Sequence, residues 1–286
     1  MKALNKQDVF KMDLEIKKTL TSNWFKMLQN SICDTIIKLE NKKVKFESTF
    51  WSKSKKKNEG GGEYRILKNG KVFDKVGVNF SKVYGKFPKQ LQKNIPGAQK
   101  NPKFWASGIS VVMHMKNPLI PAMHFNTRYI CTTHEWFGGG MDVTPSKNDE
   151  NEKKEFHKIL KNMCDRHNMN YYRKYKKWCD QYFYLPHRKE TRGIGGIFFD
   201  YKKNDFEKDF KFVRDVGITF QTIFQNIILK KIKKKWTKKD KEIQYTKRGR
   251  YIEFNLLYDR GTKFGLQTGG NIEGILMSIP PLAKWK

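Results

Sequence analysis

The chain has 286 residues, of which 38% are hydrophobic and 14% aromatic, and its 59 Lys and Arg against 28 Asp and Glu give a formal net charge of +31. A chain of this length buries roughly three quarters of its unfolded surface, so it needs no disulfide or metal to fold. No stretch approaches the ~20 uninterrupted apolar residues of a membrane span, and the N-terminus lacks the apolar core of a secretory signal. We therefore expect a globular, cytoplasmic protein.

The basic excess favours anionic partners in general. Its lysines are spread over the whole chain and no recognised nucleic-acid motif accompanies them, so nucleic acid is not the expected partner. The cysteines stand far apart with no Cys-x-x-Cys pair, which favours free buried thiols in a reducing compartment. They are Cys33, Cys131, Cys164 and Cys179.

The N-terminal third combines a helical region with strands. Apolar residues from Asp8 to Leu39 follow three- and four-residue spacing, which predicts one or two amphipathic helices within residues 1–45. Phe46 to Trp51 is typical of a short strand, and the polar, glycine-rich segment from Ser52 to Glu63 is expected to be a loop. Two strand-like segments flank Asn69-Gly70, a strong hairpin signal.

The centre of the chain is rich in β-branched and aromatic residues. Phe104 to Met115 and Ile120 to Ile130 predict a second hairpin. His134 to Val143 is expected to be a further strand, broken at its three consecutive glycines, Gly138 to Gly140.

The C-terminal half alternates helices and strands. Helices are expected at Glu152 to Cys164, Tyr171 to Leu185 and Phe206 to Lys235, and strands at Gly195 to Tyr201 and Tyr251 to Tyr258. Strand hairpins between helical blocks favour an α+β fold over the βαβ units of a parallel sheet. With no internal repeat and no linker, the whole chain is expected to form a single domain.

Chemically active residues are densest between Gly108 and Pro145. On a strand, His124, Asn126 and Arg128 share one face because side chains alternate with period two. A lone histidine or arginine in a strand is more often structural than catalytic. Their shared parity nevertheless favours a surface that presents several donors to an anionic ligand. Ser110, His114 and Asp142 fall in the same span.

Four blocks of this sequence resemble, in the same order, those of the oxygen-dependent coproporphyrinogen III oxidases. They are Phe104 to Arg128, Trp136 to Pro145, Tyr182 to Tyr201 and Arg250 to Trp285. They contain the runs YLPHR, ETRGIGGIFFD, FNLLYDRGT and FGLQTGG, which are far more specific than a short motif, and the resemblance extends from about Trp51 onward.

This resemblance implies a large antiparallel sheet flanked by helices on both faces, usually in a homodimer. We expect residues 251–286 to contribute to the dimer interface. The implied reaction is the oxidative decarboxylation of two propionates of coproporphyrinogen III to vinyl groups, giving protoporphyrinogen IX in haem biosynthesis. Dioxygen is the implied electron acceptor, and no organic cofactor is expected.

The resemblance also implies roles for single residues. The catalytic candidates are His124 as a proton donor, Arg128 as a partner of propionate carboxylates, and Asp142 as an acceptor from a pyrrole N–H. Arg192 and Arg260 are further candidates for binding carboxylates. The implied substrate-binding residues are Ser110, Asn126, Thr127, Arg128, Gly269, Gly270 and Asn271. Asn271 stands where the family usually has arginine, which removes one partner for a propionate.

A divalent metal is inferred in some bacterial members, at positions that match His114, His124, His157 and His187 here. Only the first two are close in sequence, and His187 could equally donate a hydrogen bond to a propionate. The alternative to an enzyme is a protein on the same fold that has lost turnover and binds polyanions or tetrapyrroles. The presence of His124, Arg128 and Asp142 together favours the enzyme.

Overall fold

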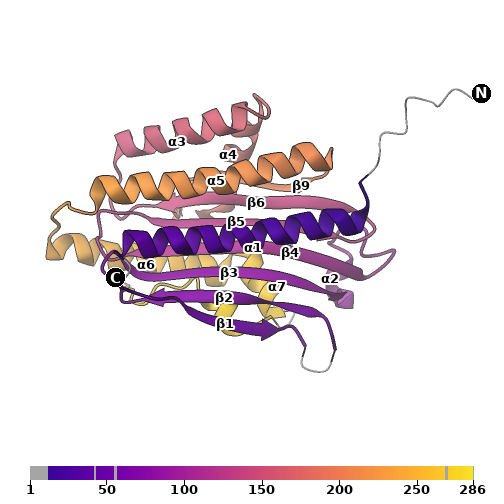
Figure 1. Ribbon diagram of the computed structural model, residues 1–286. Coiled ribbons are helices and arrows are strands. Elements are labelled where there is room, and N and C mark those ends of the chain that lie inside the picture. The colour runs from indigo at the N-terminus through magenta and orange to yellow at the C-terminus, as the bar shows by residue number, and fades with distance from the viewer. Residues whose placement is uncertain (1–11, 42, 55–56, 268–269, 286) are drawn as a thin grey trace, which may run out of the picture.

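The computed structural model describes residues 12–41, 43–54, 57–267 and 270–285. Within these residues seven strands form one antiparallel sheet, in the order β1-β2-β3-β4-β5-β6-β9 (Figure 1). The last strand joins the edge beside β6 after a helical excursion of the chain. The strands are β1 (Glu47–Ser52), β2 (Gly60–Lys68), β3 (Phe73–Lys86), β4 (Lys103–Met115), β5 (Ala122–Cys131), β6 (Glu135–Thr144) and β9 (Gly196–Lys202).

Helices cover both faces of this sheet (Figure 1). On one face α1 and α5 lie side by side and run roughly along the strands, and α3 packs against α5. On the other face lie α6 and α7, while α4 packs against the edge strand β9. The helices are α1 (Leu14–Leu39), α2 (Lys89–Gln92), α3 (Glu150–Asp165), α4 (Tyr171–Tyr182), α5 (Phe206–Lys231), α6 (Lys238–Leu257), α7 (Arg260–Gln267) and α8 (Ile272–Leu276).

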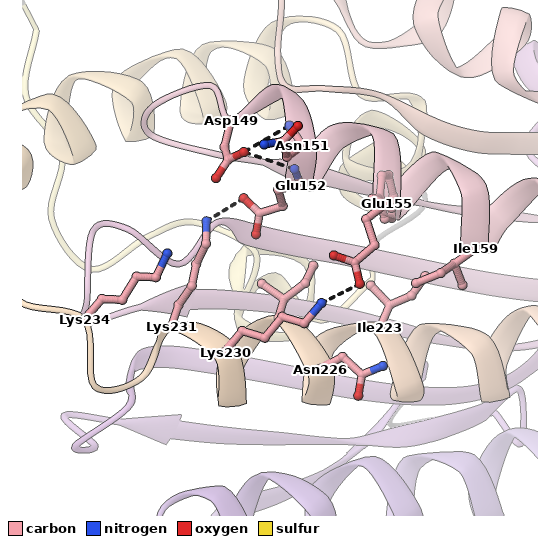
Figure 2. A pocket seen from close by; sticks show the side chains of 12 residues that line it. Asp149, Asn151, Glu152, Glu155, Ile159, Ile223, Asn226, Lys230, Lys231 and Lys234 are labelled. Atoms are coloured by element: carbon pink, nitrogen blue, oxygen red, sulfur yellow. Dashed lines mark hydrogen bonds and ion pairs between the residues drawn. The ribbon is translucent and has the colours of Figure 1, made fainter.

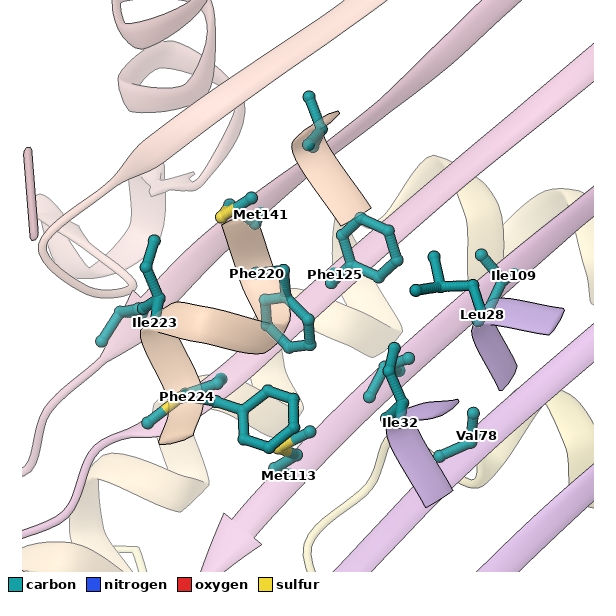
Figure 3. Packing of buried hydrophobic residues seen from close by; sticks show 14 of the residues in the cluster. Leu28, Ile32, Val78, Ile109, Met113, Phe125, Met141, Phe220, Ile223 and Phe224 are labelled. Atoms are coloured by element: carbon teal, nitrogen blue, oxygen red, sulfur yellow. The ribbon is translucent and has the colours of Figure 1, made fainter. Parts of the chain in front are cut away.

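The main core lies between the sheet and the α1/α5 pair. Leu28 and Ile32 from α1 and Phe220 and Phe224 from α5 point onto the apolar side chains of the strands (Figure 3). The rings of Phe125 and Phe220 stack with their centroids 4.9 Å apart. Each such side chain contributes about 1.5–3 kcal/mol when it is fully buried. This packing fixes which face of the sheet is left for chemistry.

The predicted α+β fold, with helices on both faces of an antiparallel sheet, is confirmed. Residues 14–39 form one continuous helix, and the predicted helical residues 8–11 lie outside the described residues. The hairpin at Asn69-Gly70 joins β2 to β3, with Asn69 in the left-handed conformation at φ 56°. The second predicted hairpin joins β4 to β5. None of the described helices is long and apolar enough to cross a membrane.

The glycine runs do not interrupt strands, contrary to both predictions. Residues 138–140 lie inside the continuous strand β6, and β2 already begins at Gly60 within the predicted loop. The glycines of β6 allow close approach of neighbouring backbone. A Cβ at Gly139 would meet the carbonyl oxygen of Asn126 closer than real Cβ contacts ever come.

The predicted strand from Tyr251 to Tyr258 is wrong, because these residues end helix α6. Thr237 starts that helix with a capping box, in which it exchanges hydrogen bonds with Asp240. Tyr251, Phe254 and Asn255 are then buried at the i, i+3, i+4 spacing of one helix face. Two predicted helices also end early, at Tyr182 and Lys231. After α4, a short strand β7 (Tyr184–Leu185), a 3-10 turn (Pro186–Arg188) and a strand β8 (Glu190–Thr191) follow.

Candidate active site

Strand β5 separates the core of the protein from a polar surface. Burial alternates strictly along it, and its more buried side chains, such as Phe125 and Tyr129, enter the core under α1 and α5. The less buried side chains, His124, Asn126 and Arg128, therefore all project from the opposite face, on which α6 lies. We call this the polar face. The predicted common face of the three residues is confirmed.

The register of the sheet brings further predicted residues to the polar face. His124 pairs with Asp142 of β6, and Asn126 pairs with Ser110 of β4 on its other side. Three of the residues that pair with Asn126 and Arg128 on the neighbouring strands are glycines, so no side chain there stands between a ligand and the backbone of the sheet. They are Gly108, Gly138 and Gly140.

Three charged or titratable side chains form a hydrogen-bonded chain on this face. His124 Nδ1 lies 2.8 Å from Asp142 Oδ1, and Arg192 Nη2 lies 2.7 and 2.6 Å from the two carboxylate oxygens of Asp142. An ionised carboxylate only accepts hydrogen bonds, so His124 carries its proton on Nδ1. Burial alone would raise the pKa of Asp142, but the Arg192 charge and the hydrogen bond from His124 outweigh it and lower the pKa. Asp142 is therefore ionised.

An aromatic cage holds Arg192 in place. Its guanidinium carbon lies 4.1 Å from the ring centroid of Phe183, 4.4 Å from that of Tyr251 and 4.8 Å from that of Phe254. Nη1 donates to Asn255 Oδ1 at 2.9 Å. An arginine guanidinium can stack its plane on aromatic rings and donate two hydrogen bonds to one carboxylate, whereas a lysine ammonium can do neither. The expected role of Arg192 as a direct carboxylate ligand does not fit this structure, because its side chain is buried against Asp142.

The free nitrogen of His124 faces Asn126. Asn126 Nδ2 lies 3.1 Å from His124 Nε2, while Asn126 Oδ1 is buried without a partner among the described residues. Turning the amide by 180° would present this oxygen to a protonated Nε2. Asn126 can thus accompany either protonation state of His124.

Arg128 is held at the edge of the polar face by a residue that the sequence did not single out. Its Nη2 lies 2.6 Å from Asp200 Oδ2 on β9. The pair lies over Gly138, where a Cβ would collide with the Asp200 carboxylate and come within 2.9 Å of Arg128 Nη2. One third of the Arg128 side chain remains exposed, so it can still meet a ligand.

The other predicted substrate-binding residues lie apart from this group or are otherwise engaged. Thr127 faces the core and is 1% exposed. The Asn271 side chain caps α8 by accepting from Gly274 N at 2.9 Å. Gly270 N donates to the Gly265 carbonyl at 2.9 Å, and Gly269 lies outside the described residues.

The structure does not bring the four proposed metal-binding histidines together. Among the described residues, no group of three or more His, Cys, Asp or Glu side chains is placed to hold a metal ion. Each histidine instead has its own partner in a different element. His114 and His157 face the carbonyls of Ser278 and Ile194, His124 faces Asp142, and His187 faces Glu253 and Tyr258. The residues present therefore do not fit a four-histidine metal site.

A cavity lies between α3 and α5, away from the polar face (Figure 2). Its volume is about 210 Å³, and its floor is apolar. Lys231 pairs with Glu152 at 2.5 Å, and Lys230 pairs with Glu155. The lining carries three basic side chains, Lys230, Lys231 and Lys234, and three acidic ones, Asp149, Glu152 and Glu155, so it has no net charge that would favour an anionic ligand.

Asp200 and Asn255, which hold Arg128 and Arg192, were not found by sequence reasoning. Asp200 ends the run ETRGIGGIFFD, where its position opposite Arg128 depends on how β9 pairs. Asn255 lies in the segment whose sequence predicts a strand. Recognising the helical spacing of Tyr251 and Asn255 would have placed both on one side of α6.

The structure is that of an α+β protein whose polar face gathers the His124–Asp142–Arg192 chain and the partly exposed Arg128 over a row of glycines. The model of the family described as coproporphyrinogen III oxidase matches residues 20–286. A relative in Rickettsia akari (strain Hartford), named oxygen-dependent coproporphyrinogen-III oxidase, is 51% identical over 94% of this chain and 98% of its own length. Relatives of the same name in Rickettsia rickettsii (strain Sheila Smith) and Rickettsia bellii (strain RML369-C) are 50% and 51% identical, over 96% and 93% of this chain and 100% and 97% of their own lengths. The chain belongs to the coproporphyrinogen III oxidase family.

Proposed function

We propose that this protein catalyses the oxygen-dependent oxidative decarboxylation of two propionates of coproporphyrinogen III to vinyl groups. The observation that carries the proposal is the hydrogen-bonded series His124–Asp142–Arg192 on the polar face. It lies on the same face of the sheet as Arg128 and the glycines Gly108, Gly138 and Gly140. About half of the sequence is identical to relatives that carry the name of this activity.

The reaction requires charge recognition and proton handling more than an organic cofactor. Each propionate loses its carboxylate as CO2 and one hydrogen from the β-carbon, next to the pyrrole, which together release one proton and two electrons. Dioxygen accepts the two electrons and two protons to give hydrogen peroxide. Arg128 binds a carboxylate of the substrate through the guanidinium N–H groups that its contact with Asp200 leaves free, because one third of the side chain is exposed. Gly108 and Gly140 leave space for the macrocycle to approach the sheet. Orientation and electrostatics are then the main contributions of the protein.

His124 is the proposed proton-transfer residue, and Asp142 acts through it. Both oxygens of Asp142 are engaged by Arg192 and His124 and its side chain is 2% exposed, so it orients the imidazole and does not contact the substrate in this arrangement. This differs from the expected contact with a pyrrole N–H. Fixing the tautomer in this way leaves Nε2 to exchange the proton.

We also propose a homodimer in the cytoplasm, with residues 251–286 in the interface. In support, several large apolar side chains of this segment are exposed, and a second subunit could cover them. They are Leu256, Leu257, Leu266, Ile272, Leu282 and Trp285. Light scattering coupled to size exclusion tests the assembly, and a strictly monomeric chain at micromolar concentration would contradict it.

Purified protein should be incubated aerobically with coproporphyrinogen III, and the products oxidised and read by porphyrin fluorescence. The expected result is a two-carboxylate porphyrin whose formation stops when dioxygen is removed. Tight tetrapyrrole binding without any product would favour the alternative, a protein that has lost turnover.

A further inference from the structure

A small cavity borders the polar face where β4, β6 and α6 meet. His114 of β4, Thr144 of β6, and Gln244 and Tyr251 of α6 line it. Its volume is about 20 Å³. Space of ~10–15 Å³ is sufficient for one water molecule, so the cavity holds one water and little more.

The four side chains have one buried polar atom each without a hydrogen-bond partner among the described residues. These atoms are His114 Nδ1, Thr144 Oγ1, Gln244 Oε1 and Tyr251 Oη. All four residues are more than nine-tenths buried. Unpaired buried polar groups are destabilising, and native proteins satisfy them with ordered water or a ligand. All four residues line the same cavity, which indicates an occupant.

Two of the four atoms can only accept hydrogen bonds. His114 Nε2 lies 2.8 Å from the Ser278 carbonyl, so this nitrogen carries the proton and Nδ1 accepts. Burial lowers the pKa of His114 to about 3, which keeps the ring neutral. Gln244 Nε2 donates to the Met115 carbonyl at 2.8 Å, which fixes the amide and leaves Oε1 as the acceptor. The occupant must therefore donate two hydrogen bonds.

The other two atoms, the hydroxyls of Thr144 and Tyr251, are free to donate. We propose that the cavity binds a single water molecule, which donates to His114 and Gln244 and accepts from Thr144 and Tyr251. Two donors and two acceptors are what one water offers.

Other small occupants fit less well. Dioxygen has no hydrogen to give to the two acceptors. A metal cation would sit beside Arg248 and Lys247, which also line the cavity, and no carboxylate is among the lining residues. Lys247 is partly exposed, so the cavity lies close enough to the surface for exchange with solvent.

This water would connect α6 to two strands of the sheet. Thr144 lies two residues beyond Asp142 on the same face of β6, and the Tyr251 ring contacts the Arg192 guanidinium. Through this water, α6, whose Tyr251 contacts Arg192, would be hydrogen-bonded to β6, which carries Asp142, the partner of Arg192. The site does not depend on which reaction the polar face performs.

The decisive comparison uses two isosteric threonine variants in the full chain. Thr144→Val removes a donor to the water and is expected to reduce the folding equilibrium constant by about 2- to 12-fold, the usual effect of one hydrogen bond. Thr127→Val is the matched control, since the Thr127 hydroxyl is also buried without a partner among the described residues but does not line the cavity. The control should be neutral or stabilising. Urea denaturation measures both.

A crystal structure at a resolution that shows ordered solvent supplies the second readout. The proposal predicts one density peak within hydrogen-bond distance of at least three of the four atoms, and its loss or displacement in Thr144→Val. An empty cavity, or an ion at the short distances of metal ligation, overturns it. So does a Thr144→Val variant that is as stable as the Thr127→Val control.

Discussion

Replacing Asp142 by asparagine would leave the Arg192 guanidinium charged, buried and without its carboxylate. Both side chains are 2% exposed, and the two Nη2–oxygen distances of 2.6 and 2.7 Å describe a close ion pair. Removing one partner of such a pair costs about 3–5 kcal/mol. Because asparagine keeps one carbonyl acceptor, we expect the lower end, ~3 kcal/mol, which is a large part of the ~5–15 kcal/mol of a typical domain.

The double variant Asp142→Asn with Arg192→Met separates stability from function. With both charges gone, the apolar cage around position 192 accommodates methionine, and most of the lost free energy of unfolding should return. Activity should not return, because His124 still lacks the carboxylate that orients it. Misplaced proton transfer typically costs about 10²–10⁴ in rate.

Urea denaturation followed by tryptophan fluorescence measures the first quantity, with midpoints compared at constant slope. Steady-state turnover measures the second. If Asp142→Asn lowered the free energy of unfolding by less than ~1 kcal/mol, the reasoning about the ion pair would be refuted, because breaking a buried pair costs several kcal/mol. A double variant no more stable than the single one would also refute it.

Four further outcomes follow from the site. Arg128→Ala should raise the KM for the tetrapyrrole about 10- to 100-fold, the equivalent of hydrogen bonds to a charged group, and an unchanged KM would remove Arg128 from the site. Gly138→Ala should abolish most activity with an unchanged circular dichroism spectrum, because a Cβ there displaces the pair of Arg128 and Asp200; full activity would contradict this geometry. The pKa of His114 is lowered from 6.5 to about 3 by burial, so its stabilising effect is complete above pH 6.5 and is lost as the pH falls towards 3. His114→Gln should therefore flatten the acid dependence of stability in that window, and an unchanged slope would count against it. Exhaustive chelation should leave turnover intact, and loss that zinc or manganese restores would reinstate a metal site.

Much of the polar face was predictable because it depends on local periodicity. Strand alternation alone places His124, Asn126 and Arg128 on one surface. The positions of Asp142 and Ser110 beside them require the register of two neighbouring strands. That register is set by the two hairpins that join β4 to β5 and β5 to β6, and the sequence predicts the first of them.

The contacts that organise this face were not predictable from local pattern. Arg192 meets Asp142 fifty residues away in the chain, and Asp200 meets Arg128 across a strand pair that no hairpin connects. The segment around Tyr251 satisfies strand alternation and helix periodicity alike. The capping box at Thr237 and the contact of Tyr251 with Arg192 are what favour the helix over the strand here. Where two periods fit equally well, tertiary packing selects one.

The most direct test of the account is a crystal structure of the protein with a bound coproporphyrin-type tetrapyrrole. We predict a macrocycle over Gly108, Ser110 and Gly140, with one carboxylate on Arg128 and His124 Nε2 turned towards the ligand. A tetrapyrrole bound instead in the cavity between α3 and α5, with the polar face empty, would contradict it.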